Sequence, residues 1–254
     1  MTIKKREKSQ KIDNKMSGQT LQILGVKVNS TSINSVLRFV RRKITQKRKF
    51  WITTPNPEFI VAAQKDEEFR RILNSADLAI PDGYGLVLAS KFLGTKPRLL
   101  ERVAGVDVVE KLLKVSSKEG WRIGVIGARK GKTEEIKTLI QKLQNKYKGA
   151  KIEGLENTPF WQKKNYTIIF ACQGAKLQEK WIFENFRRIN ASLFMGVGGS
   201  LDFLSGFTRR APTWMRNLGL EWLWRLILRP SHSKRILVAC VFFPWLVLKE
   251  KLKS

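Results

Sequence analysis

The chain has few of the side chains that bind metals or form disulfides. Its 254 residues include two cysteines, Cys172 and Cys240, and one histidine, His232. The cysteines do not have the paired spacing of a zinc site, so we expect buried thiols in a reducing compartment. A single histidine argues against a metal site built on several histidines and against a Ser-His-Asp triad. Because no Asp-x-Asp motif is present either, we expect no metal and no cofactor.

Acidic residues are also scarce. Lys and Arg number 49 against 21 Asp and Glu, which gives a formal net charge of +28. A charge of this size indicates a polyanionic partner: a nucleic acid, an anionic lipid surface or a phosphate-rich substrate. Composition alone does not choose among these three.

The sequence lacks a long hydrophobic segment as well. No apolar stretch follows the basic N-terminal residues, so we expect no secretory signal. The last apolar run, residues 236–248, contains Pro244 and as a helix would extend about 20 Å, whereas the hydrocarbon core of a bilayer is roughly 30 Å thick. We expect this run to lie on a membrane or to dip into one leaflet.

Changes in composition divide the chain into three expected regions. Residues 1–19 are basic and poor in apolar side chains, which is typical of a disordered arm. Residues 20–207 carry the patterns of a folded domain. Residues 208–254 contain ten Lys or Arg and four of the eight tryptophans, a composition typical of interfacial membrane helices. We expect a helical, Trp-rich appendage that contacts an anionic membrane surface; the alternative is that its Trp and Leu side chains pack on the core.

Apolar runs of strand type alternate with helical periodicity through the folded domain. This alternation predicts an α/β fold with a mainly parallel sheet and helices on both faces. The expected strands are residues 21–28 (or a short hairpin there), 50–54, 78–80, 121–126, 150–154, 166–172 and 191–197, and the expected helices are 33–44, 57–74, 84–93, 105–118 and 134–147.

Polar side chains follow the ends of two of these strands. The first ends at Thr54-Pro55-Asn56, and the second ends at Pro81-Asp82-Gly83. The carboxyl ends of parallel strands are where α/β proteins bind ligands. Asp82 is therefore our candidate acid or base, and Arg102, a short way downstream, suits an anionic leaving group. An ordinary Pro-Asp-Gly turn without chemistry is the alternative.

The loop after residues 121–126 is rich in glycine but matches no phosphate-binding motif. Three residues separate Gly127 from Gly131, where a P-loop has four, and together with Gly124 they do not have the spacing of a dinucleotide-binding fingerprint. The amides of this strand-to-helix turn, including that of Gly127, could still hold a phosphate or a sugar hydroxyl. A plain connection is equally compatible with the sequence.

Six motifs, in the same order along the chain, resemble the WecG/TagA/CpsF family of bacterial glycosyltransferases. Each motif is weak alone, but together they cover most of the sequence between residues 20 and 235. They are residues 54–58 (TPNPE), 80–83 (IPDG), 101–107 (ERVAGVD), 174–179 (GAKLQE), 196–202 (GVGGSLD) and 210–215 with 219–222 (RAPTWM and GLEW).

The resemblance implies an inverting, metal-independent enzyme with a Rossmann-like α/β fold. Its family moves a sugar, commonly N-acetylmannosamine or a related one, from a UDP-sugar donor to an acceptor sugar linked to polyprenyl diphosphate. Such reactions serve the synthesis of cell-surface polysaccharide or teichoic acid. The implied location is cytoplasmic and peripheral, on the inner face of the cell membrane. An exposed Trp-rich appendage would also suit a homo-oligomer.

The resemblance also implies roles for single residues. Asp82 would be the base, and Thr54 and Asn56 would line the pocket for donor and acceptor. Arg102 and Gln178 would contact the substrate, as Arg210 would contact a diphosphate. The other motif positions that we expect to bind substrate are Asp107, Gly174, Glu179, Gly198 and Gly199.

The chain departs from the family pattern in two places. Lys176-Leu177 stands where Pro-Lys is usual, and Arg229-Pro230 stands where Glu-Pro is usual. These changes leave the donor sugar open.

Two alternatives to a transferase are an oxidoreductase with a nucleotide cofactor, which shares the α/β pattern but needs the missing glycine fingerprint, and a nucleic-acid-binding protein. The second is supported by charge alone, since the tryptophans gather in the tail, and we expect no nucleic-acid partner.

Overall fold

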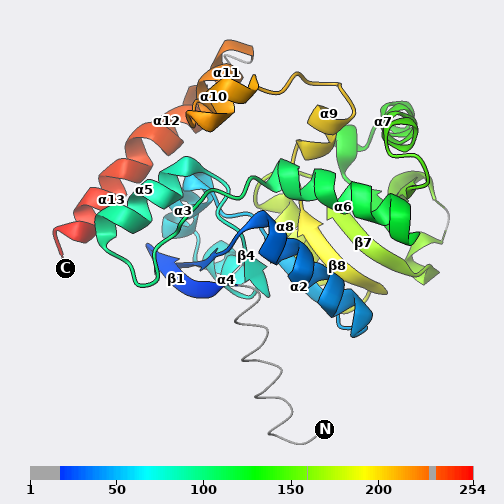
Figure 1. The fold of residues 1–254 in the computed structure, drawn as a ribbon, viewed down its shortest axis with the longest axis horizontal. Coiled ribbons are helices and arrows are strands. Elements are labelled where there is room, and N and C mark those ends of the chain that lie inside the picture. Colours follow the sequence, from blue (N-terminus) through cyan, green and yellow to red (C-terminus); the bar gives the residue numbers. More distant parts are fainter. Residues whose placement is uncertain (1–17, 159, 229–232, 254) are drawn as a thin grey trace, which may run out of the picture.

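The centre of the molecule is a six-stranded sheet in which every pair of neighbours is parallel. The computed structural model describes residues 18–158, 160–228 and 233–253 (Figure 1). The strand order is β4-β3-β8-β7-β5-β6. The strands are β3 (Phe50–Thr53), β4 (Leu78–Ala79), β5 (Arg122–Ile126), β6 (Lys151–Gly154), β7 (Tyr166–Ala171) and β8 (Ala191–Gly196).

Helices cover both faces of this sheet, as the sequence predicts. Successive side chains of a strand point to opposite faces. Thus Ile168 of β7 packs in a cluster with side chains of α2 (Ile33–Thr45), α6 (Gly105–Glu119) and α7 (Thr133–Lys146). The next residue, Ile169, packs with side chains of α4 (Glu67–Asn74) and α8 (Leu177–Asn185) on the other face. The expected Rossmann-like arrangement of layers is confirmed.

The segment at residues 21–28 is a hairpin rather than one strand. Strand β1 (Gln19–Ile23) pairs with β2 (Val26–Ser30) in a separate antiparallel sheet. Their apolar side chains pack with those of α3 (Pro57–Lys65), α4 and α5 (Tyr84–Leu93). Residue 19, which we assigned to the basic arm, already belongs to β1.

The prediction of one helix over residues 57–74 is wrong. Asp66 has an extended backbone, with ψ of 94°, and separates α3 from α4. Its side chain accepts a hydrogen bond from the amide of Phe69 at 2.9 Å and so caps α4.

The expectation of two buried thiols is also wrong in part, because Cys240 is exposed.

After α9 (Ser200–Leu204) the chain crosses above the sheet as a loop, and the C-terminal helices that follow lie beside α3 and α5 (Figure 1). Phe243 and Val247 are buried among side chains of α3 and α5. The expected helical appendage is therefore present, and part of its apolar surface packs on the core. Helix α9 precedes the appendage. The elements of the appendage are α10 (Thr213–Asn217), α11 (Glu221–Leu228), α12 (Ser233–Leu237), η5 (Val238–Phe242) and α13 (Phe243–Lys251).

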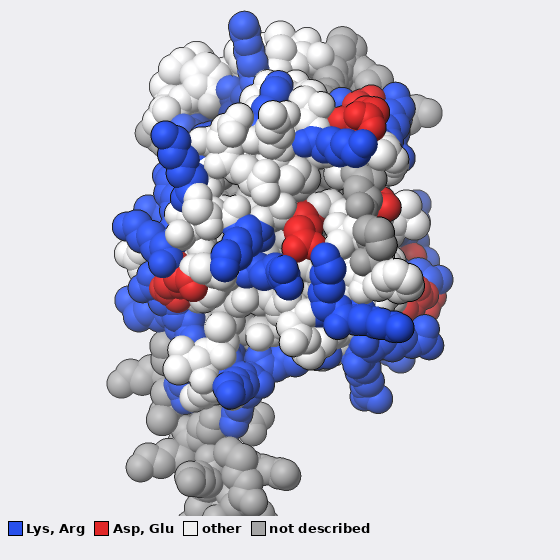
Figure 2. All heavy atoms as spheres, turned by 90° about the vertical axis from the view of Figure 1, so that its right-hand side faces the viewer, with Lys and Arg blue, Asp and Glu red and all other residues white. Residues whose placement is uncertain are grey.

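Within the described ranges, no helix combines the length and apolar character needed to cross a bilayer. Basic side chains are spread over the side of the molecule that carries α7, with a few acidic ones among them (Figure 2). Three of the features expected from the sequence lie outside the described residues: the basic arm up to residue 17, His232 and the Arg229-Pro230 pair.

Candidate active site

Two adjoining cavities open above the carboxyl ends of the strands. The first, which we call the loop cavity, has a volume of about 670 Å³ and lies between the short helix η1 (Ala128–Gly131), the β7–α8 loop and the start of α9. The second, which we call the cleft, has a volume of about 440 Å³. They share five lining residues: Lys130, Gly174, Gly198, Gly199 and Asp202.

The cleft brings together residues that the sequence places far apart. Five of the predicted site residues line it in addition to the shared glycines: Thr54, Asn56, Asp82, Arg102 and Gln178. The wall opposite the core comes from the appendage, through Arg209, Trp224, Leu228 and Arg235.

Backbone hydrogen bonds hold Asp82 at the carboxyl edge of the sheet. Its amide donates to the carbonyl of Pro55 at 2.9 Å, and the amide of Val103 donates to the carbonyl of Pro81 at 3.0 Å. The three loops that follow β3, follow β4 and precede α6 are thereby tied together. These bonds place Asp82 beside the loop that carries Arg102. The sequence predicted both residues near one edge of the sheet.

Gly105 leaves room for the carboxylate. A Cβ atom added there would lie 3.3 Å from Oδ2 of Asp82 and 3.3 Å from Cγ2 of Thr54. Both side chains therefore reach over the first turn of α6, where a larger residue would displace them. Thr54 itself is buried, and the side-chain oxygen of Asn56 accepts the amide hydrogen of Phe59 at 2.9 Å, which caps α3.

A chain of alternating charges connects Asp82 to the appendage. Nη2 of Arg102 lies 3.7 Å from Oδ1 of Asp82 and also donates to Glu221. Glu221 is paired in turn with Arg210, which donates to Asp107 in the first turn of α6. Burial opposes the charge of Arg102, but Asp82 and Glu221 outweigh it and raise the pKa of Arg102. Arg102 therefore remains a cation beside Asp82.

Arg210 and Asp107 form a structural link between appendage and core. Burial opposes the charge of Arg210, but the bond to Asp107 and the nearby Glu221 raise its pKa. Neither residue is among those that line the loop cavity or the cleft in the described part of the chain. Their expected contact with substrate stays a prediction.

Gln178 and Glu179 act as a pair at the start of α8. The side-chain oxygen of Gln178 accepts the amide hydrogen of Gly198 at 2.9 Å, and its nitrogen donates to Glu179 at 2.7 Å. Glu179 also accepts the amide hydrogen of Lys176 and is fully buried, which raises its pKa to about 7. Gln178 faces the cleft, whereas Glu179 lies behind it and holds the Gln178 amide in place.

Of the predicted glycines, Gly127 lines the loop cavity, and Gly174, Gly198 and Gly199 line both cavities. Gly127 has a φ of +72°, and a side chain there would collide with Gln173. Its amide donates to Glu156, so this amide is already occupied. By contrast, a Cβ atom added at Gly174 or Gly199 would have no neighbouring atom within 4 Å. These two glycines leave open space between the cavities.

Several residues at the site were not singled out from the sequence. Glu221 and Asp202 stand inside the recognised motifs, which was a usable signal, but their charge partners were unknown. Lys130 and Arg209 carried no signal beyond their charge. In the described ranges, no group of three His, Cys, Asp or Glu side chains is placed to hold a metal ion.

Comparison with known proteins identifies relatives along nearly the whole chain. The sequence model of the "Glycosyl transferase WecG/TagA/CpsF family" matches residues 21–254. A Bacillus subtilis (strain 168) protein is 35% identical over 244 residues, covering 92% of this chain and 93% of its own length. A Bacillus spizizenii protein is 30% identical over 203 residues, covering 76% and 77%. A Staphylococcus aureus (strain NCTC 8325 / PS 47) protein is 27% identical over 263 residues, covering 100% and 98%. All three are named N-acetylglucosaminyldiphosphoundecaprenol N-acetyl-beta-D-mannosaminyltransferase.

Proposed function

The chain belongs to the WecG/TagA/CpsF family of glycosyltransferases, and we propose that it transfers N-acetylmannosamine from a UDP-sugar to N-acetylglucosaminyl-diphosphoundecaprenol. The product would be an early lipid-linked intermediate of teichoic-acid synthesis. The shared name of the three relatives supports this transferred sugar and this acceptor. Family membership favours a transferase over an oxidoreductase or a nucleic-acid-binding protein.

The observation that carries the mechanism is the position of Asp82, which lines the cleft within 3.7 Å of Arg102. In the proposed reaction the carboxylate of Asp82 accepts the proton of the acceptor hydroxyl. That oxygen forms a bond to C1 of the donor sugar while the bond from C1 to the diphosphate oxygen breaks. UDP departs with the electron pair, and attack from the opposite side inverts the configuration at C1.

Four further residues of the cleft are proposed to position the substrates. Arg102 would orient Asp82 and contribute positive charge near the diphosphate. Thr54 and Asn56, at the end of β3, would bind hydroxyls or the acetamido group. Gln178, whose oxygen is held by Gly198, retains one amide hydrogen that could be donated into the cleft.

The appendage is proposed to hold the enzyme on the inner face of the membrane. On α12 and α13 the side chains of Leu237, Trp245 and Leu248 remain about half exposed, at 50%, 55% and 48%. Apolar side chains beside Lys249 and Lys251 suit an interface between anionic headgroups and acyl chains. A lipid-linked acceptor would be found on that surface.

A donor and acceptor screen tests the function directly. The full chain is incubated with a short-chain prenyl-diphosphate-GlcNAc acceptor and a panel of UDP-sugars, and released UDP is measured together with the mass of the product. We expect turnover with UDP-N-acetylmannosamine and a mass gain of one N-acetylhexosamine. Turnover with a different UDP-sugar would correct the donor, whereas no transfer with any donor would overturn the proposal.

A further inference from the structure

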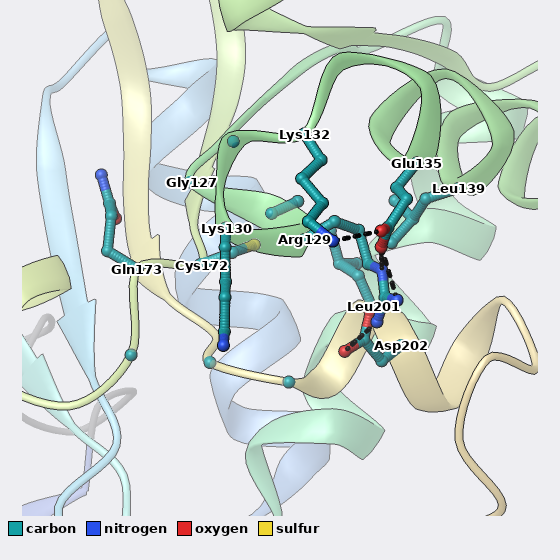
Figure 3. Close-up of a pocket in the computed structure, with 15 residues that line it drawn as sticks. Gly127, Arg129, Lys130, Lys132, Glu135, Leu139, Cys172, Gln173, Leu201 and Asp202 are labelled. Carbon is teal, nitrogen blue, oxygen red and sulfur yellow. Dashed lines mark hydrogen bonds and ion pairs between the residues drawn. The ribbon is translucent and has the colours of Figure 1, made fainter.

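The short helix η1 contains two residues in an unusual backbone conformation. Arg129 and Lys130 have φ angles of +50° and +54°, in the left-handed region that residues with a side chain rarely adopt. The two side chains diverge from this turn (Figure 3). Arg129 turns toward α7 and α9, while Lys130 extends alone across the cavity.

Arg129 is fully occupied by carboxylates. Its guanidinium contacts Glu135 at 2.6 Å and Asp202 at 3.4 Å. Lys132, the next basic residue, pairs with Glu135 at 3.1 Å. Lys130, in contrast, has neither an ion pair nor a hydrogen bond from its ammonium group to any described residue. Arg129 and Lys132 are therefore neutralised by carboxylates, whereas the ammonium group of Lys130 remains available to a ligand in the cavity.

Lys130 also lies where the loop cavity and the cleft meet. Of the basic residues that line either cavity in the described ranges, it alone lines both. Arg102 and Arg235 line only the cleft and are paired with carboxylates, and Arg209 lines only the cleft. Gly174 and Gly199 also line both cavities, and nothing lies within 4 Å of a Cβ atom added at either, so no atom crowds this boundary.

This position matches the layout of a nucleotide sugar, in which a diphosphate joins the sugar to the nucleoside. If the sugar lies in the cleft near Asp82, the diphosphate falls on the residues that the cavities share, and the nucleoside enters the loop cavity. We propose that Lys130 binds the diphosphate of the donor and that the loop cavity takes its nucleoside. This inference rests on the proposed function, because it takes the reacting sugar to lie near Asp82.

Lys130 would act on the leaving group. As the bond from C1 to the diphosphate oxygen breaks, the electron pair passes to that oxygen. An ammonium group that donates a hydrogen bond to the diphosphate stabilises this charge more in the transition state than in the bound donor. Substitution of Lys130 should therefore lower both the affinity for UDP and the rate of transfer.

Isothermal titration of the full chain with UDP and with uridine tests the assignment. Two variants remove the ammonium group: Lys130→Gln keeps a flexible polar side chain that is one atom shorter, and Lys130→Gly suits the positive φ and guards against a misfolded loop. We expect both to bind UDP about tenfold or more weakly, the loss typical of a charge-assisted hydrogen bond, and to bind uridine as the wild type does. Lys130→Arg should recover part of the affinity.

The matched control is Lys137→Ala on α7, which removes one exposed positive charge outside both cavities and should bind UDP normally. Wild-type affinity for UDP in both Lys130 variants would overturn the role of Lys130. So would an equal loss of UDP and uridine binding, which would indicate a damaged loop. If the wild type and variants bind UDP as expected but the wild type transfers no sugar, the proposed function fails while the diphosphate site stands. No UDP binding by the wild type would overturn both.

Discussion

Arg102, on the loop before α6, and Glu221, the first residue of α11, form a buried ion pair beside Asp82. One partner belongs to the core and the other to the appendage. The pair therefore couples the docking of the C-terminal helices to the orientation of the side chain that neighbours the candidate base.

The first prediction concerns Asp82. Asp82→Asn keeps the shape of the side chain but removes its capacity to accept a proton, so we expect kcat to fall about 10²- to 10⁴-fold, the range for loss of a general base. Affinity for UDP should remain close to that of the wild type. Steady-state kinetics and UDP titration measure both quantities. Near-normal turnover would remove Asp82 from the role of base.

The second concerns Glu221, which is buried between Arg102 and Arg210. Glu221→Gln removes the carboxylate that these two partly buried cations share, although Arg102 keeps Asp82 and Arg210 keeps Asp107. Loss of a hydrogen bond to a charged group typically costs about 1.5–3 kcal/mol. We expect a clear decrease in the free energy of unfolding in urea and reduced turnover. Glu184→Gln, at an exposed position of α8, is the control. Equal stability of the two variants would contradict the coupling.

The third concerns Gly105, whose missing side chain makes room for Asp82 and Thr54. Gly105→Ala should leave stability within about 1 kcal/mol, because alanine is favoured in helices. It should nevertheless lower kcat about tenfold, since small misplacements of a catalytic group are costly. Lys118→Ala on the exposed face of α6 is the control. Unchanged kinetics in Gly105→Ala would show that Asp82 can move without consequence.

The fourth concerns the pH dependence of stability. Burial raises the pKa of Glu179 to about 7, above its ordinary value of 4.5. Between these values the folded protein binds a proton that the unfolded chain has released, so this contribution to stability is present at low pH and is lost as pH rises toward 7. Relative to Glu179→Gln, the wild type should lose up to about 1.4 kcal/mol per pH unit in that window. Urea unfolding at pH 5, 6 and 7 measures it, and parallel curves would exclude the titration.

The fifth concerns the membrane. Replacing Leu237, Trp245 and Leu248 by serine removes exposed apolar side chains without touching the buried Phe243. The triple variant should co-sediment less with anionic liposomes than the wild type does, because buried apolar area drives interfacial binding. Leu177→Ser, exposed on α8 of the core, is the control. If wild type and triple variant sediment equally, these side chains do not contact the membrane.

Much of the site could be predicted from the sequence because parallel strands bring their carboxyl ends to one edge. Prolines mark the ends of two strands, so the positions of Thr54, Asn56 and Asp82 follow from local signals. The alternation of strands and helices supplied the rest of the fold. Asp66 was missed as a helix boundary because the apolar periodicity continues on both sides of it.

Charge pairing between distant segments could not be predicted in the same way. A sequence shows that Arg210 and Asp107 are charged, but not that they lie together across 103 positions. Likewise, the Gln178 side chain turns out to be held by the Gly198 amide and by Glu179. Whether a polar group faces a ligand or another side chain depends on tertiary packing, which short sequence motifs do not show.

The strand order has a consequence for the loop cavity. After β5 the chain continues through α7 to β6, away from the centre of the sheet, whereas after β7 it continues through α8 to β8 in the opposite direction. The two helices lie on opposite faces, so their connections diverge and leave a crevice between adjacent strand ends. Any chain with this topology must open there, and the β5–α7 turn decides what the opening accepts.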